Sequence, residues 1–171
     1  MKKVLATLSI CLSFSSSTLY ADSNRLIMVG YSNVDGDVYN GQAIYMDFGF
    51  RYGETIKQKV GLRYTYMIDS DYDKAGSLGG LWDVNYQIGY EVYKDITCSI
   101  FGGYAFEDVA TNNMKSVMAA GFTYGAEVSY KFNDLLQFGI EYKKYDLSYE
   151  ISGVEPEYDY KLLSAYIGFQ L

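Results

Sequence analysis

The stretch GFTYGAEVSYKF, residues 121–132, separates into two kinds of side chain when every second residue is read. The bulky, apolar series is Phe122, Tyr124, Ala126, Val128, Tyr130 and Phe132. The small or charged series is Gly121, Thr123, Gly125, Glu127, Ser129 and Lys131. A period of two is the period of a β-strand, whose successive side chains point to opposite faces. The stretch therefore predicts a strand with one apolar face, and the surroundings of that face decide the class of protein.

The same alternation recurs along the chain and predicts eight strands. Their ranges are 25–32, 42–52, 56–68, 81–93, 96–106, 117–132, 135–145 and a last strand through Leu163 to the chain end. The connections at 53–55, 94–95 and 133–134 are tight, which suits antiparallel hairpins, whereas the other connections are long and polar. Short turns at one end and long loops at the other are typical of an outer-membrane barrel. The sequence thus predicts an all-β fold, an eight-stranded antiparallel up-and-down transmembrane β-barrel.

The bulky face of these strands is predicted to face lipid. The interior of an eight-stranded barrel only just holds its side chains, so it has no room for the bulky series. Glycines alternate with charged residues on the other face, where they make room inside a narrow barrel. The aromatic residues expected in interfacial girdles near the strand ends are Tyr31, Tyr52, Tyr66, Trp82, Tyr90, Tyr104, Tyr130 and Tyr142. A soluble, lipocalin-like periplasmic ligand carrier, with its bulky face inward, is the alternative.

The first 21 residues have the order of a secretion signal. Lys2 and Lys3 precede the apolar run VLATLSICLSF, and small and polar residues lead to Ala21, the predicted cleavage site. Residues 22–171 then form the barrel. The 14 basic and 21 acidic residues of the chain become 12 and 21 without the signal, a net charge of −9, which argues against a nucleic-acid partner. Cys98 is the one cysteine left, so no intrachain disulfide is expected.

The small face of the strands carries charged side chains that the fold turns toward the lumen. A narrow lumen of low dielectric requires such charges to pair, and we expect the charges of two adjacent strands, residues 127–131 and 141–143, to reach one another across the ladder. A polar core that plugs the barrel is favoured over an ion path with a salt-bridge gate, because such lumens are normally filled. The predicted lumen charge network comprises Asp47, Arg51, Lys59, Arg63, Asp83, Glu91, Glu127, Lys131, Glu141 and Lys143.

The sequence offers no recognisable catalytic site. It contains no histidine, which excludes the familiar catalytic triads and the usual histidine-rich metal sites, so neither enzymatic activity nor a cofactor is expected. Asp69, Asp71 and Asp73 are similar to the start of a calcium loop. The sixth position is Lys74 instead of glycine and no glutamate follows at the twelfth, so these residues are weak metal candidates.

The four long loops are predicted to form an acidic rim. Such a rim fits divalent-cation-bridged contact with lipopolysaccharide or contact with a basic host or envelope surface, although simple solubility explains it equally well. The only bases in these loops are Lys74 and Lys115. The acids are Asp35, Asp37, Asp69, Asp71, Asp73, Glu107, Asp108, Asp146, Glu150, Glu155, Glu157 and Asp159.

Segments such as AIYMDFGFRYG, residues 43–53, and LLSAYIGFQL, residues 162–171, resemble the small outer-membrane barrels of the OmpA and OmpX type. The resemblance implies a structural or surface-interaction role, adhesin-like or envelope-stabilising, in the outer membrane of a Gram-negative bacterium. It also implies membrane lipid and the barrel-assembly machinery as partners. Barrels of this type usually end in phenylalanine, whereas this chain ends in Leu171 with Phe169 two residues before, and no periplasmic domain is expected. A narrow, porin-like channel for ions or small solutes is the alternative.

Overall fold

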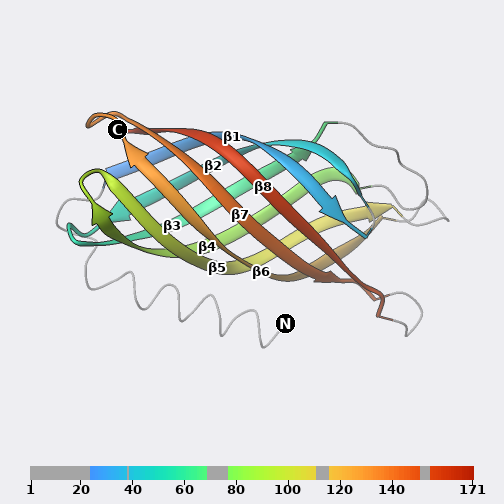
Figure 1. The fold of residues 1–171 in the computed structure, drawn as a ribbon. Coiled ribbons are helices and arrows are strands. Elements are labelled where there is room, and N and C mark those ends of the chain that lie inside the picture. The colour runs from blue at the N-terminus through green and yellow to red at the C-terminus, as the bar shows by residue number, and fades with distance from the viewer. Residues whose placement is uncertain (1–23, 38, 69–76, 111–115, 151–154) are drawn as a thin grey trace.

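The computed structural model is a single closed barrel of eight strands (Figure 1). It describes residues 24–37, 39–68, 77–110, 116–150 and 155–171. The strands are β1 (Asn24–Gly36), β2 (Gly41–Tyr52), β3 (Ile56–Met67), β4 (Ser77–Tyr93), β5 (Ile96–Ala110), β6 (Ser116–Lys131), β7 (Leu136–Ser148) and β8 (Glu157–Gln170). Each strand pairs antiparallel with the next, and β1 pairs with β8, so the predicted fold class is confirmed. No helix long and apolar enough to cross a membrane occurs in the described part of the chain.

The three tight turns gather at one end of the barrel, here called the tight-turn end, together with the C-terminus (Figure 1). Gly53 and Asp95 have positive φ values of 89° and 63°, which the sharp reversals after β2 and β4 require. The turn between β6 and β7 is closed by Asn133, whose side-chain oxygen accepts hydrogen bonds from the amides of Leu135 and Leu136 at 2.9 and 2.8 Å. The opposite end, with the longer connections, is called the loop end.

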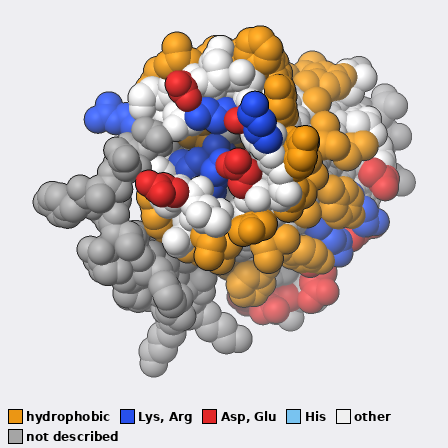
Figure 2. Space-filling model, turned by 60° about the vertical axis from the view of Figure 1, so that its left-hand side comes forward, with side chains coloured by type: hydrophobic (Ala, Val, Ile, Leu, Met, Phe, Trp, Pro, Cys, Tyr) orange, Lys and Arg blue, Asp and Glu red, His pale blue; other side chains and the backbone are white. Residues whose placement is uncertain are grey.

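The outer face of the barrel is apolar, as the opening stretch predicts. Phe122 is 60% exposed and Val128 44%, whereas Thr123 and Glu127 on the other face of β6 are almost completely buried. Hydrophobic side chains form a continuous surface on the visible flank of the barrel (Figure 2). A soluble carrier would have turned these side chains inward, so the structure contradicts that alternative.

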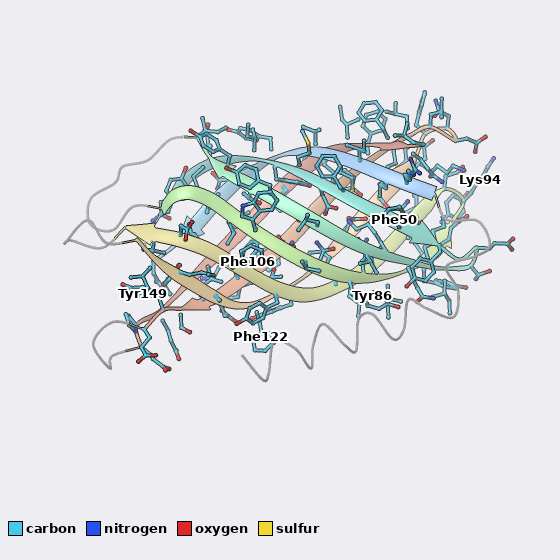
Figure 3. The ribbon with its side chains drawn as sticks, turned by 180° about the vertical axis from the view of Figure 1, so that it is seen from behind. Phe50, Tyr86, Lys94, Phe106, Phe122 and Tyr149 are labelled. Atoms are coloured by element: carbon cyan, nitrogen blue, oxygen red, sulfur yellow. The ribbon has the colours of Figure 1, made fainter. Side chains whose placement is uncertain are left out.

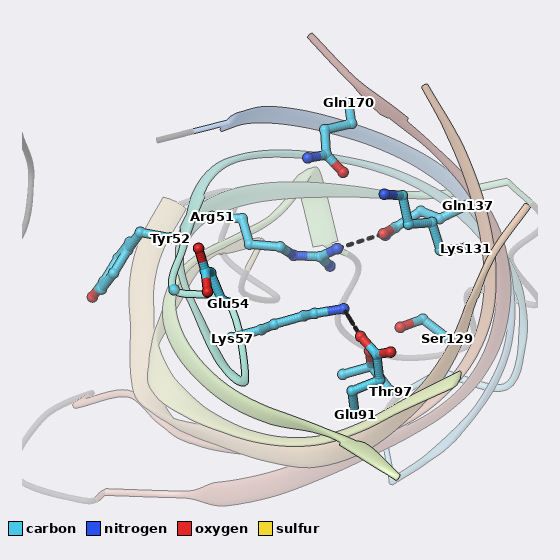
Figure 4. Close-up of a pocket in the computed structure, with 11 residues that line it drawn as sticks. Arg51, Tyr52, Glu54, Lys57, Glu91, Thr97, Ser129, Lys131, Gln137 and Gln170 are labelled. Carbon is cyan, nitrogen blue, oxygen red and sulfur yellow. Dashed lines mark hydrogen bonds and ion pairs between the residues drawn. The ribbon is translucent and has the colours of Figure 1, made fainter. Parts of the chain in front are cut away.

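One predicted girdle residue departs from this pattern. Tyr52 points away from the lumen (Figure 4), but only 5% of its surface is exposed. Its ladder neighbour Gln58 accepts a hydrogen bond from the Tyr86 hydroxyl on the outer face. The remaining predicted girdle residues are exposed or half-buried: Tyr31, Tyr66, Trp82, Tyr90, Tyr104, Tyr130 and Tyr142.

The strands extend further toward the loop end than predicted. β1 continues to Gly36, β5 to Ala110 and β7 to Ser148, so these segments are strands and not loops. In these extensions the polarity of the two faces is reversed: the apolar side chains point inward and the charged side chains point outward. The buried residues of these extensions include Val34, Val109, Leu147, Tyr158 and Tyr160, and they alternate with the outward Asp35, Asp108, Asp146, Asp159 and Lys161. The predicted strands are too short at this end because charged outward residues resemble loop residues in the sequence.

Candidate functional site: the lumen

The centre of the lumen is organised around Arg63 on β3. Its guanidinium lies 3.2 Å from a carboxylate oxygen of Asp47, the direct ladder partner on β2. It also donates a 2.7 Å hydrogen bond to Glu141 on β7. The Arg63 side chain lies 4.0 Å above the ring of Tyr45, and Arg63, Asp47 and Glu141 are all completely or almost completely buried. Arg63 therefore links β2 and β3 to the distant strand β7 across the barrel.

A second buried group is centred on Asp83 of β4. Lys143 of β7 lies 2.8 Å from one carboxylate oxygen, and the Tyr145 hydroxyl donates to the other at 2.7 Å. Asn85 donates a further hydrogen bond of 2.9 Å. In the first group, Lys59 pairs with Asp47 at 3.1 Å. The predicted charges are thus brought together, because burial of a charge requires a partner and further hydrogen bonds.

The predicted pairing between β6 and β7 is wrong. Glu127 faces Glu141 directly in the ladder, so the two nearest inward charges have the same sign. Glu127 accepts a 3.0 Å hydrogen bond from Gln87 and forms no ion pair among the described residues. Lys131 instead pairs with Asp134 of the following turn at 2.7 Å. The register, which depends on the length of the turn, decides which side chains are opposite.

The other predicted charges lie at the tight-turn end. Arg51 donates a 2.6 Å hydrogen bond to the Gln137 side chain, and Lys57 pairs with Glu91 at 2.7 Å. A cavity of about 220 Å³, lined by these residues, opens here. Figure 2 shows the hollow with charged side chains at its rim, and Figure 4 shows the residues that line it. Arg51, Glu91 and Lys131 therefore belong to the mouth of the barrel and not to its buried centre.

The loop end of the lumen is filled by an apolar cluster, which the sequence analysis missed. Glu107, expected in a loop, lies on β5 in this region, is 2% exposed and accepts a 3.0 Å hydrogen bond from the Tyr158 hydroxyl. The alternation of Tyr158, Tyr160 and Leu162 with charged residues was the signal that could have revealed it. The loop-end cluster consists of Val34, Tyr39, Ala43, Met67, Leu81, Ala105, Val109, Ala119, Tyr145, Leu147, Tyr158, Tyr160 and Leu162.

The weak calcium candidates Asp69, Asp71 and Asp73 lie outside the described residues, as does the predicted signal at 1–21. Within the described residues, no group of three or more histidine, cysteine, aspartate or glutamate side chains has the arrangement of a metal site.

Comparison with known proteins identifies the fold. No protein-family model and no curated protein matches the chain. Among solved structures, the chain is similar to Neisserial surface protein A, with a TM-score of 0.60 and 8% identity over 86% of this chain and 97% of that protein. The attachment invasion locus protein Ail of Yersinia pestis gives a TM-score of 0.57 and 11% identity over 87% and 97% of the two chains.

The N-terminal barrel domain of Pseudomonas aeruginosa OprF gives a TM-score of 0.56 and 8% identity over 88% of this chain and 100% of that domain. At these identities the likeness concerns the fold. The apolar outer face, the charged lumen and the closed antiparallel ladder agree with it. This chain has the fold of the small eight-stranded outer-membrane β-barrels.

Proposed function

We propose that this protein is an integral barrel of the Gram-negative outer membrane with a closed lumen, which acts through its surface as an envelope-stabilising or adhesin-like protein. The observation that carries the proposal is the arrangement of two successive layers in the lumen. The ion pairs of Arg63 and Lys143 cross the barrel at its centre, and the loop-end cluster fills the space beyond them.

An ion that passed through the lumen would have to separate both layers. Arg63 and Glu141 are each almost completely buried, and separating them would leave Glu141 without its ion pair, and Arg63 with Asp47 alone, in a region of low dielectric. An aqueous path would also have to displace apolar side chains such as Leu81 and Leu162, neither of which has any exposed surface. The cavity at the tight-turn end is therefore a vestibule and does not continue through the lumen.

Conductance of the purified, refolded protein in planar lipid bilayers tests the closed lumen. We expect almost no current at either polarity. Brief openings that become more frequent in Glu141→Gln would support a salt-bridge gate instead. Large, steady conductance of the unmodified protein would contradict the proposal and support the porin-like alternative.

The surface of the loop end is acidic, which favours partners that carry positive charge or are bridged by cations. Its outward residues include Asp37, Asp108, Asp146 and Glu157, and Lys144 is already paired with Asp146 at 2.7 Å and Asp159 at 3.1 Å. Ail of Yersinia pestis has also been solved with the heparin analogue sucrose octasulfate, a polyanion. We propose that this chain has the opposite preference, for a basic surface or for lipopolysaccharide bridged by divalent cations.

Binding measurements on the barrel in nanodiscs test this preference. We expect retention on a poly-lysine surface, weak or no retention on heparin, and binding to lipopolysaccharide that requires magnesium and is lost with a chelator. An Asp108→Asn, Asp146→Asn double variant, which keeps the size of both side chains, should weaken each interaction. Equal binding of parent and variant, or preference for heparin, would contradict the acidic surface as the binding face.

We further propose that residues 1–21 are the secretion signal and that residues 22–171 form the mature barrel. The support comes from the charged, apolar and small-residue order of the segment. Amino-terminal sequencing of the protein recovered from outer membranes should begin at Asp22. An intact Met1 would contradict cleavage.

A further inference from the structure

We propose that the mouth at the tight-turn end binds a small oxyanion, a phosphate or a carboxylate, on the guanidinium of Arg51. This site is separate from the buried ion pairs and does not depend on whether the lumen conducts. Among the described cations that line the mouth, Lys57 and Lys131 each pair with a carboxylate, whereas Arg51 donates its described hydrogen bond to the neutral side chain of Gln137 at 2.6 Å.

Arg51 forms no ion pair with any described residue. The described ion pairs that involve mouth residues are Lys57–Glu91 and Lys131–Asp134, and neither includes Arg51. The direct ladder partner of Arg51 is Lys59, which is buried and pairs with Asp47. Like charges directly opposite each other on neighbouring strands are destabilising, and Asp47 offsets the charge of Lys59, whereas Arg51 has no carboxylate partner among the described ion pairs.

The surroundings of Arg51 suit an oxyanion. Arg51 and Lys57 extend into the cavity from one wall, and Gln137 and Lys131 lie at the other (Figure 4). Three cations, Arg51, Lys57 and Lys131, and two acids, Glu54 and Glu91, line the cavity. Lys57 pairs with Glu91 and Lys131 with Asp134, so Arg51 is the one cation of the described lining that has no ion pair.

Buried polar groups complete the lining of this cavity of about 220 Å³. Thr97, Ser129 and Gln137 line it and are each about 5% exposed. The planar guanidinium fork matches the oxygens of a phosphate or a carboxylate. Because the loop-end cluster fills the lumen beyond the central charges, the anion would enter from the tight-turn side.

The test is a titration of the full-length barrel, folded in detergent micelles, with sodium phosphate and separately with sodium acetate at constant ionic strength. The readout is the Nε–Hε NMR signal of Arg51, with calorimetry for the variants. We expect saturable binding of at least one anion, and the stronger of the two indicates whether phosphate or carboxylate is the preferred group. Arg51→Gln should weaken binding at least tenfold, as expected for the loss of a hydrogen bond to a charged group.

Two further variants make the result specific. Lys94→Gln removes one positive charge from the β4–β5 turn at the same end of the barrel (Figure 3) but outside the cavity lining, and it should bind like the parent. Gln137→Glu places a carboxylate against Arg51 without changing the size of the side chain. It should weaken anion binding at least tenfold while the barrel still folds, which a heat-dependent shift on SDS gels reports.

Several outcomes would overturn the proposal. These are no saturable binding of either anion by the parent, unchanged binding in Gln137→Glu, and unchanged binding in a folded Arg51→Gln. An equal loss in Arg51→Gln and Lys94→Gln would also overturn it, because general charge attraction would then explain the binding. If Arg51→Gln does not fold, Gln137→Glu decides.

Discussion

The ring of Tyr45 on β2 lies directly over Gly30, its ladder partner on β1, so that a Cβ on Gly30 would collide with the ring. Tyr166 covers its partner Gly139 in the same way, and here too a Cβ would meet the ring. These glycines provide the space that a large aromatic side chain occupies inside a narrow lumen. The pairing explains how an eight-stranded interior holds both aromatic rings and a charge network.

Gly30→Ala should destabilise the barrel by about 1–3 kcal/mol, the usual cost of forcing an extra carbon into a packed interior. Gly102→Ala is the matched control, because a Cβ there meets only the Thr123 carbonyl oxygen at 3.8 Å. The measurement is urea-induced unfolding in lipid vesicles or detergent, followed by tryptophan fluorescence of Trp82. Equal stability of the two variants would show that the Tyr45 ring moves aside at no cost.

Glu141→Gln and Glu127→Gln should differ in stability although the two residues are opposite each other. Glu141 pairs with Arg63, so its neutralisation leaves a buried guanidinium with one carboxylate fewer and should cost about 3 kcal/mol. Glu127 has no described ion pair and faces Glu141, so its neutralisation removes a like-charge contact and should leave stability unchanged or raise it. Thermal unfolding at neutral pH measures both. A loss in Glu127→Gln as large as in Glu141→Gln would contradict this account of the network.

Val128→Arg should cost about 2–4 kcal/mol in a lipid bilayer, because it places a charge on the lipid-facing side of β6 near the midplane. Asp108→Arg is the control, since this outward position on β5 belongs to the charged extension at the loop end. The fraction folded into vesicles of defined lipid measures the effect. Equal folding of parent and Val128→Arg would show that this face does not contact lipid.

Cys98 should resist a membrane-impermeant maleimide on intact cells and react completely after denaturation. It is exposed on the outer face of β5, where lipid would shield it from an aqueous reagent. Mass spectrometry of the labelled protein measures the reaction. An engineered cysteine at the outward position 108 of the loop-end extension should react readily and serves as the positive control. Rapid labelling of Cys98 on intact cells would contradict its place in the lipid-facing surface.

The fold was predictable because a period of two repeats on every strand and needs no long-range information. The bulky face could be assigned to the outside because the barrel interior is too small to hold its side chains. Phe122 and Val128 lie outside and Thr123 and Glu127 inside, as predicted. The strand ends at the loop end were not predictable in the same way. Beyond the lipid belt the outer face meets water, so its residues become charged and resemble loop residues in the sequence.

The members of the lumen network were largely predictable, but their partners were not. The alternation of inward and outward residues along each strand predicted that Arg63 and Glu141 lie in the lumen, and the structure confirms that position. Their contact joins β3 to β7, and that between Lys143 and Asp83 joins β7 to β4. Such contacts depend on the closure and tilt of the barrel, which no local pattern encodes. The ladder neighbour, which local reasoning favours, was the wrong partner for Glu127.

Leu162 and Leu163 on β8 mark the depth at which the barrel would sit in a membrane. Leu162 is completely buried in the loop-end cluster, and Leu163, the next residue, is 62% exposed on the outer face. On the outer face, the charged Lys161 is followed by the apolar Leu163. On the inner face, the apolar Leu162 is followed by the polar Ser164, so the polarity of both faces changes at the same level of the barrel. A shift by two residues along the tilted strand, about 7 Å, would bring Lys161 into hydrocarbon or Leu163 into water. This dipeptide thus marks where the hydrocarbon of the membrane would end on β8. Charged substitutions on the outer face should be tolerated on the loop-end side of Leu163 and should destabilise the barrel on the tight-turn side.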